Sequence, residues 1–236
     1  MGGMGQKFAL AASIAWGQHG RVSRSQLLAE GIDAEQIKRW IRDGRLRPVH
    51  KGVYAVGHTA PSTPATYTAA VLACGRGARL SHYADAHVLR LLPGDPPPPE
   101  VTVPTAAHRR RPGIIIHRVR ELPEQDTSTL DSIRILTAPR TLLDLAPSLP
   151  PAKLTRACHE AWHRYGTSPE DIEACIARSP HKHGIAKLRR ALGADVVLSP
   201  WRSASSTSCG STGCRFRGRT SRSAAAWWTA TGLTTS

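Results

Sequence analysis

The sequence lacks the features that mark membrane and disulfide-rich secreted proteins. No apolar run approaches the roughly 20 residues that a helix needs to cross a bilayer. The apolar residues 8–15 are too few for a signal peptide and no convincing cleavage site follows them. The five cysteines are an odd number, without the spacing of a disulfide framework or a metal finger. We therefore expect a cytoplasmic protein with no membrane partner.

Acidic residues are scarce relative to basic ones. The chain has 17 Asp and Glu against 32 Lys and Arg, which gives a formal net charge of +15 over 236 residues. Such an excess favours a polyanionic partner, most simply nucleic acid, with an anionic membrane surface as the other class. Aromatic residues make up only 5% of the chain, but 40% hydrophobic residues are compatible with one or two globular domains.

Residues 22–57 form the stretch around which we expect the chain to be organised. Ser23 suits the N-cap of a short helix over residues 25–30, because its side-chain oxygen can accept amide hydrogens of the first turn. Asp33 suits the N-cap of a second helix, and Gly44 ends it. The segment therefore predicts two consecutive short helices joined by a tight turn.

The second helix and the residues after it complete a recognisable unit. Ile37, Trp40 and Ile41 recur with helical spacing and predict one apolar stripe that faces a core. Beyond the helix, two short runs of β-forming residues flank Lys51-Gly52 and predict a two-stranded hairpin. Two short helices followed by a basic hairpin are typical of a winged helix-turn-helix, which lays one helix in the major groove of DNA.

Cationic and polar side chains gather on the outer face of this unit. We expect Gln36, Arg39 and their neighbours to lie near base edges, and the hairpin cations to hold the phosphate backbone. The full set of expected DNA contacts is Ser25, Gln26, Gln36, Lys38, Arg39, Arg42, Arg45, Arg47, His50 and Lys51. The alternative is a small structural unit with an ordinary solvated face. Clustering on one surface favours phosphate neutralisation over that alternative.

Prolines after the hairpin mark a boundary, and the pattern beyond it predicts a second domain of mixed type. We expect helices over residues 67–74, 82–92, 140–146, 152–165 and 168–177, and strands over residues 101–104, 114–119 and 133–136. The fold class is therefore α+β. The expected organisation is a winged helix-turn-helix over residues 1–60, a mixed α/β domain over residues 61–197, and a tail over residues 198–236.

A basic loop, residues 108–111, separates the first two of these strands. It either touches phosphate or forms the solvated tip of a hairpin. The sequence leaves both alternatives open.

Several segments resemble one family. Those that carry the resemblance are residues 20–27 (GRVSRSQL), 45–57 (RLRPVHKGVYAVG), 70–93 (AVLACGRGARLSHYADAHVLRLLP) and 137–146 (TAPRTLLDLA). Together they resemble the AbiEi-like antitoxins of type IV toxin–antitoxin systems. The resemblance implies a winged helix that binds double-stranded DNA at its own promoter and represses its operon. It also implies a second domain that counteracts a nucleotidyltransferase-like toxin, and hence a regulator without a cofactor rather than an enzyme.

The tail changes composition abruptly. Acidic residues and lysine vanish from Trp201 onward, and such a segment is expected to be disordered. Many actinobacterial chains of this type carry a C-terminal restriction-endonuclease-like domain. Back-translation with GC-rich codons, shifted by two nucleotides, gives a peptide that resembles the start of that domain. The hypothesis is a frameshift near residues 198–201, which leaves a remnant of an endonuclease-like fusion without its catalytic domain.

One motif points to an enzyme instead. His159-Glu160-Ala161-Trp162-His163 matches the H-E-x-x-H of zinc peptidases, in which two histidines one helical turn apart bind zinc and the glutamate activates water. Pro169 stands where such peptidases often have a third ligand. The apolar stripe of the same predicted helix leaves His159, Glu160 and His163 outside the core. We interpret them as an exposed polar face and keep a zinc metallopeptidase as the second alternative.

Overall fold

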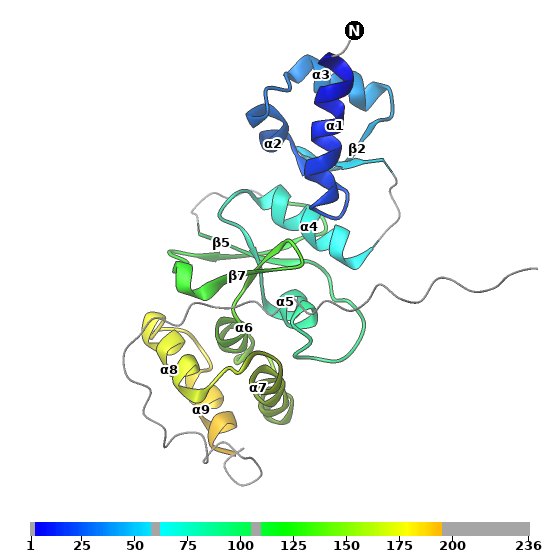
Figure 1. Cartoon of the computed structure of the whole chain (residues 1–236). Helices are drawn as coiled ribbons and strands as arrows, with labels where there is room; N and C mark the ends of the chain where they lie inside the picture. The colour runs from blue at the N-terminus through cyan, green and yellow to red at the C-terminus, as the bar shows by residue number, and fades with distance from the viewer. Residues whose placement is uncertain (1–2, 58–61, 105–109, 195–236) are drawn as a thin grey trace, which may run out of the picture. The chain divides into compact units, whose positions relative to one another are not determined.

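A computed structural model describes residues 3–57, 62–104 and 110–194 of the chain (Figure 1). The described residues belong to one compact unit. The described residues combine helices with two sheets, which confirms the expected α+β class. The predictions of a disordered tail over residues 198–236 and of a frameshift lie outside the described residues.

The N-terminal elements alternate helix and strand in a defined order. They are α1 (Gly3–Trp16), β1 (Arg21–Ser23), α2 (Arg24–Ala29), α3 (Ala34–Arg42), β2 (Leu46–His50) and β3 (Val53–Val56). The three strands form an antiparallel sheet in the order β1-β3-β2. Helix, strand, two helices and a hairpin are the elements of a winged helix, so the predicted unit is confirmed. Strand β1 was not predicted, because three residues are too few to show an alternating pattern.

Capping side chains fix the starts of α2 and α3. The Ser23 side chain accepts from the backbone N–H of Gln26, and Gln26 Oε1 accepts from the backbone N–H of Ser23 at 2.9 Å. Asp33 Oδ1 accepts from the N–H of Gln36 at 2.7 Å. Gly44 follows α3 with φ of +72°, a conformation that favours glycine. The predicted caps are therefore confirmed, with α2 starting one residue earlier than expected.

The winged helix has its own hydrophobic cluster. Its buried members are Ala11, Ala15, Val22, Leu27, Ile32, Ile37, Trp40, Leu46 and Tyr54. Ile37 and Trp40 are only 2% and 1% exposed, and the Phe8 ring meets the Trp40 ring edge to face at 5.2 Å. The apolar stripe predicted for the second helix is therefore confirmed, although Ile41 is only half-buried.

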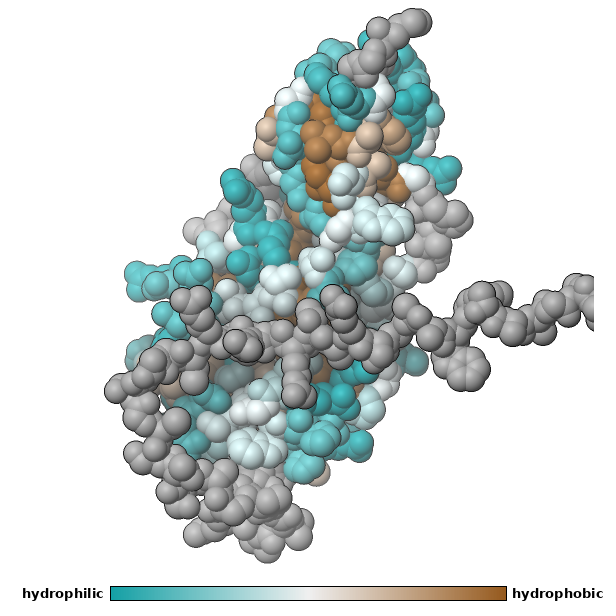
Figure 2. Space-filling model, viewed as in Figure 1, coloured by the Kyte–Doolittle hydropathy of each residue, from teal (hydrophilic) through white to brown (hydrophobic). Residues whose placement is uncertain are grey.

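Helix α1 also carries apolar side chains on its outer side. Leu10 is 40% exposed and Trp16 is 90% exposed. Figure 2 shows hydrophobic surface over this part of the chain. The helix is thus less amphipathic than α3, whose outer face is charged.

The remaining described elements are the strands of a second sheet and the helices around it. They are α4 (Thr63–Cys74), β4 (Arg79–Leu80), α5 (His82–Val88), β5 (Glu100–Pro104), β6 (Ile115–Val119), the 3-10 turn Glu124–Asp126, β7 (Thr127–Leu130), β8 (Ile133–Leu136), α6 (Ala138–Leu145), α7 (Pro151–Tyr165), α8 (Pro169–Arg178) and α9 (Ile185–Ala194). The strand order is β6-β5-β4-β8-β7. A larger hydrophobic cluster, with Tyr67, Leu80, Val101 and Leu142 among its buried members, joins this sheet to its helices.

A buried ionic network ties α6 to the segments around it. The Arg140 side chain is 1% exposed and donates to Asp126 at 2.9 Å and to Asp144 at 3.2 Å. Arg178 also pairs with Asp126, and Lys182 pairs with Asp144. Both aspartates are fully buried at the side chain, so each depends on these cations for compensation.

Two predictions about the second sheet region were wrong. Helix α5 ends at Val88 rather than near Leu92, because Arg90 adopts a left-handed φ of +56° that breaks the helix. The Ser81 side chain makes no cap hydrogen bond there. The chain therefore turns before Leu91 and Leu92, which the helix expected over residues 82–92 had included.

Strands β5 and β6 pair in parallel, so the second alternative for residues 108–111, the tip of a hairpin, is wrong. A run of β-branched residues shows that a strand forms, but it does not encode the direction of its partner. Residues 108 and 109 of the basic loop lie outside the described residues. Strand β7 and helix α9 were not predicted, β7 because it is short and α9 because its basic side chains mask the buried Leu188 and Ala191.

Candidate nucleic-acid interface

Helix α3 has two chemically distinct faces. Ile37 and Trp40 are buried, while Lys38, Arg39 and Arg42 are exposed. Arg39 and Arg42 lie in the last turn, one helical turn apart. The helix therefore rests on the core by one side and presents cations on the other, as insertion into a DNA groove requires.

Two of these cations meet acidic neighbours on their own segment. Lys38 Nζ lies 2.7 Å from Glu35, and Arg42 Nε lies 3.8 Å from Asp43. Both pairs are highly exposed to solvent. Exposed ion pairs are weak and are screened by salt, so a phosphate group can replace either acidic partner.

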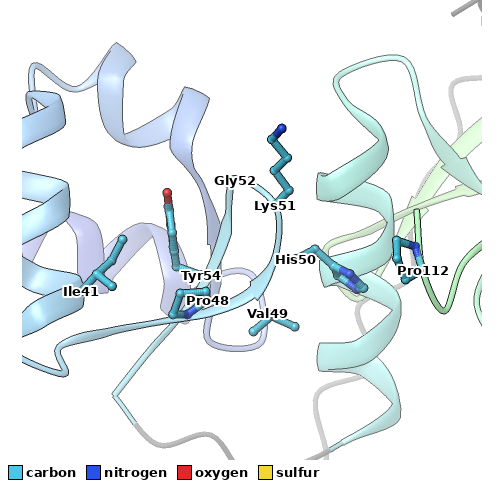
Figure 3. A pocket seen from close by; sticks show the side chains of 8 residues that line it. All are labelled: Ile41, Pro48, Val49, His50, Lys51, Gly52, Tyr54 and Pro112. Carbon is cyan, nitrogen blue, oxygen red and sulfur yellow. The ribbon is translucent and has the colours of Figure 1, made fainter. Parts of the chain in front are cut away.

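The hairpin adds further cations. Arg45, Arg47 and Lys51 are exposed, and the guanidinium carbon of Arg45 lies 5.3 Å from the centroid of the Phe8 ring. Gly52 has φ of +77° and completes the turn between β2 and β3. Figure 3 shows the Lys51 side chain projecting away from this turn.

His50 differs from the other hairpin candidates. It is half-buried and lines a hollow of about 650 Å³ together with Ile41, Pro48, Val49, Lys51, Gly52, Tyr54 and Pro112 (Figure 3). Burial lowers the pKa of His50, and the nearby Arg111 lowers it further. The lowered pKa favours the neutral imidazole, which can offer a hydrogen bond to a phosphate.

Gln26 is already engaged in capping α2, and Ser25 contacts the N-cap residue Ser23. Gln26 Oε1 accepts from both the backbone N–H and the hydroxyl of Ser23, and its Nε2 donates to Gln18 Oε1 at 2.9 Å. The Ser25 and Ser23 hydroxyls lie 2.9 Å apart. The structure thus gives these side chains a local structural role that the sequence had not assigned, and DNA contact by either stays a prediction.

Gln36 is half-buried, and its amide Nε2 is buried without a hydrogen-bond partner within the described residues. An unsatisfied buried amide costs free energy, which a hydrogen bond to a new partner would recover. Contact of Gln36 with a base edge stays a prediction.

Arg24 joins the interface although the sequence gave it no role. It is exposed at the first position of α2, and its backbone N–H donates to the carbonyl of Gly52 at 2.8 Å. Its Cβ lies 3.9 Å from the position that a Cβ at Gly52 would take. The contact places a further arginine beside the hairpin turn, and only the sheet pairing reveals it.

The H-E-x-x-H motif lies on the exposed side of α7. His159 and His163 are exposed, and Glu160 pairs with Arg164 at 2.9 Å. Among the described residues, no further histidine, cysteine or carboxylate lies close enough to His159 and His163 to form a metal-binding group with them. The exposure of both histidines agrees with the interpretation of the motif as a polar helix face.

A different group of ligand-type side chains does come together. His82, Glu100 and His117 place their ligand atoms within 4.8 Å of one another. Burial lowers the pKa of His82 to about 4, and of the smaller influences Asp144 and Glu100 raise it while His117 and Lys182 lower it. The sequence gave no signal for this group, because its members belong to separate elements and share no short motif.

None of the described helices combines the length and the apolar character that a membrane crossing needs.

Comparisons with known proteins bear on the winged helix. Residues 11–57 match the family described as "Transcriptional regulator, AbiEi antitoxin", which agrees with the resemblance of the sequence over that range. No curated protein matches the chain. The solved structure described as "Crystal structure of RV2827C protein from Mycobacterium tuberculosis" has 18% sequence identity and a TM-score of 0.36. That match covers 80% of this chain and 81% of the other.

Proposed function

We propose, from the family match over a complete winged helix, that the protein is a DNA-binding transcriptional regulator that represses its own promoter. The observation that supports this most is the coincidence of the matched residues 11–57 with the unit that carries the exposed cations. The matched family is one of regulators rather than enzymes. The proposal therefore assigns no catalytic residues to this chain.

In the proposed complex, α3 enters the major groove. Arg39 and Arg42 then face base edges and the adjacent phosphates, where arginine can form paired hydrogen bonds to guanine. Arg45, Arg47 and Lys51 contact the sugar–phosphate backbone on one side of the groove. These backbone contacts fix the register and orientation of the helix, and the base contacts supply the sequence preference.

The finer part of the proposal is an antitoxin of a type IV toxin–antitoxin system. Residues 61–197 are proposed as a separate domain that neutralises a nucleotidyltransferase-like toxin. The support is the sequence resemblance, together with a second hydrophobic cluster whose members lie outside the winged helix except for Val53 of β3. Co-expression with the product of a neighbouring toxin-like gene tests it: restored growth supports neutralisation, and continued growth arrest contradicts it.

DNA binding is tested by protection of the upstream DNA of the gene in the presence of competitor DNA. The Arg39→Ala/Arg42→Ala variant should lose protection of a discrete site. Arg189→Ala/Arg190→Ala is the matched control, because it removes two exposed arginines from α9, outside the winged helix. Equal protection by both variants would remove α3 from the interface.

The frameshift remains a hypothesis about residues 198–236. The nucleotide sequence of the gene tests it directly. An endonuclease-like peptide in the shifted frame supports the remnant of a fusion protein, and any other peptide contradicts it. In neither case does the winged-helix proposal depend on this segment.

A further inference from the structure

Three metal-ligand side chains from separate elements converge at the second sheet. His82 is the first residue of α5, Glu100 is the first residue of β5, and His117 lies in the middle of β6. Within the described ranges this is the only group of three or more histidine, cysteine or carboxylate side chains with mutually close ligand atoms. The group is therefore a specific feature of the fold rather than one of many acidic clusters.

The backbone pairing explains why these side chains meet. Thr102 pairs with His117 in the parallel β5–β6 ladder. Glu100 precedes Thr102 by two residues and so lies on the same face of the sheet. The backbone N–H of Ser81 donates to the carbonyl of Glu100 at 2.9 Å, which brings His82 beside the carboxylate.

The three side chains of the group contact one another directly. Glu100 is 8% exposed, and its Oε2 lies 2.8 Å from His117 Nε2. The rings of His82 and His117 stack with centroids 3.5 Å apart and planes 16° apart. Two imidazoles and one carboxylate therefore place their ligand atoms within 4.8 Å of one another, and one divalent cation can take all three as ligands.

The surroundings also orient one of the histidines. Ser81 is fully buried, and its hydroxyl lies 3.0 Å from His82 Nδ1. A hydrogen bond to one ring nitrogen fixes the imidazole and directs the other nitrogen, Nε2, towards a ligand. His82 also has a left-handed φ of +51°, a strained conformation of the kind that persists at functional sites.

We propose that His82, Glu100 and His117 bind a divalent transition-metal ion, with zinc as the ion best suited to two imidazoles and one carboxylate. Zinc bonds of about 2.1 Å place tetrahedral ligand atoms about 3.4 Å apart. Binding requires the stacked rings of His82 and His117 to separate, because an imidazole nitrogen binds a metal ion in the plane of its own ring. Three protein ligands leave a fourth position for water or for a group of a partner molecule.

The test uses the full chain, freed of metal by chelation and titrated with zinc chloride in a calorimeter. One saturable site per chain is expected. His82→Ala and His117→Ala should each weaken zinc binding at least about 100-fold, and Ser81→Ala should weaken it about 10- to 100-fold. The matched control is His159→Ala/His163→Ala, which removes the histidines of the exposed H-E-x-x-H motif and should leave zinc binding unchanged.

A conservative variant separates ligand loss from misfolding. Glu100→Gln keeps the size of the side chain, and circular dichroism checks that it is folded. This variant should lose tetrahedral cobalt(II) absorption that the unchanged protein shows and that zinc abolishes. An ordinary ion pair between Glu100 and His117 predicts neither metal signal. Absence of a saturable site in the unchanged protein, zinc binding retained by folded Glu100→Gln, or its loss only in the His159/His163 control would overturn the proposal.

Discussion

At the scale of single residues, Asp85 is the most strongly perturbed acid in the described part of the chain. It is fully buried in α5, and its Oδ2 accepts from the backbone N–H of Leu136 at 3.1 Å and from the Thr141 hydroxyl at 2.6 Å. Its other oxygen has no hydrogen-bond partner among the described residues. Burial raises the pKa of Asp85 well above 3.8, and the two hydrogen bonds offset only part of that effect.

The pH dependence of stability should report this residue. Because the pKa of Asp85 is higher in the folded chain, the folded state holds a proton that the unfolded state has lost above about pH 3.8. Stability from this group is therefore lost as pH rises. Asp85→Asn removes the effect, so its free energy of unfolding relative to the unchanged protein should increase from pH 4 to pH 8. Urea unfolding across that range measures the difference, and a constant difference would contradict the prediction.

Arg140 is the residue on which the buried ionic network depends. Arg140→Ala leaves the buried Asp144 with Lys182 alone and Asp126 with Arg178 alone. Breaking such a pair typically costs about 3 to 5 kcal/mol, so we expect a large loss of the free energy of unfolding.

Denaturant unfolding measures that loss. Arg189→Ala is the matched control, because Arg189 forms an exposed pair with Glu173 at 2.8 Å and its removal should leave stability nearly unchanged. Equal effects of the two substitutions would show that the network does not act as described.

At the scale of elements, substitutions at the start of α2 distinguish side chains that stabilise the helix from side chains that bind DNA. Ser23→Ala removes the N-cap oxygen and should lower the free energy of unfolding by about 1 kcal/mol. Gln26→Ala removes the reciprocal half of the capping box and should also lower thermal stability, and its DNA affinity at temperatures where the protein is folded tests whether Gln26 is in addition a DNA contact. Thermal unfolding and fluorescence anisotropy on the same samples measure both. Weaker DNA binding by Gln26→Ala without lost stability would instead make Gln26 a DNA contact.

The sequence predicted those elements whose signals are local. Ser23, Asp33 and Gly44 marked the ends of α2 and α3 because capping and left-handed φ depend on single residues. Long amphipathic segments such as α7 were found because the spacing of their apolar residues is also a local pattern. The early end of α5 depends on a left-handed φ at Arg90, a residue type that gives no signal for that conformation. The parallel partner of β5 depends on contacts far apart in the chain, and no local pattern encodes it.

The candidate sites divide in the same way. The cations of α3 and the hairpin were found because they are close in sequence as well as in space. Arg24 was missed because it reaches the hairpin turn only through sheet pairing, and His82 because its partners come from two other strands. The H-E-x-x-H motif shows the converse, since a complete local pattern lies on an exposed helix face without a third ligand among the described residues.

At the scale of the whole molecule, positive charge extends beyond the part of the chain that the family match covers. The net charge of +15 belongs to the entire chain, whereas the family match covers only the winged helix. Bulk charge alone gives salt-sensitive attraction to any DNA. Sequence-specific repression requires in addition that the cations of α3 occupy one defined groove, and this is the central claim that needs a direct test.

That test is the affinity of the purified protein for its own upstream DNA across a salt series, beside a scrambled duplex of equal length. We predict that the unchanged protein binds the native site more tightly than the scrambled duplex. The Arg39→Ala/Arg42→Ala variant should lose this preference, and the slope of its log binding constant against log salt concentration should fall by about 1 for each phosphate contact removed. The Arg189→Ala/Arg190→Ala control should keep the preference for the native site. Equal affinity of the unchanged protein for both duplexes, with the same salt slope in the α3 variant, would contradict sequence-specific DNA binding through α3.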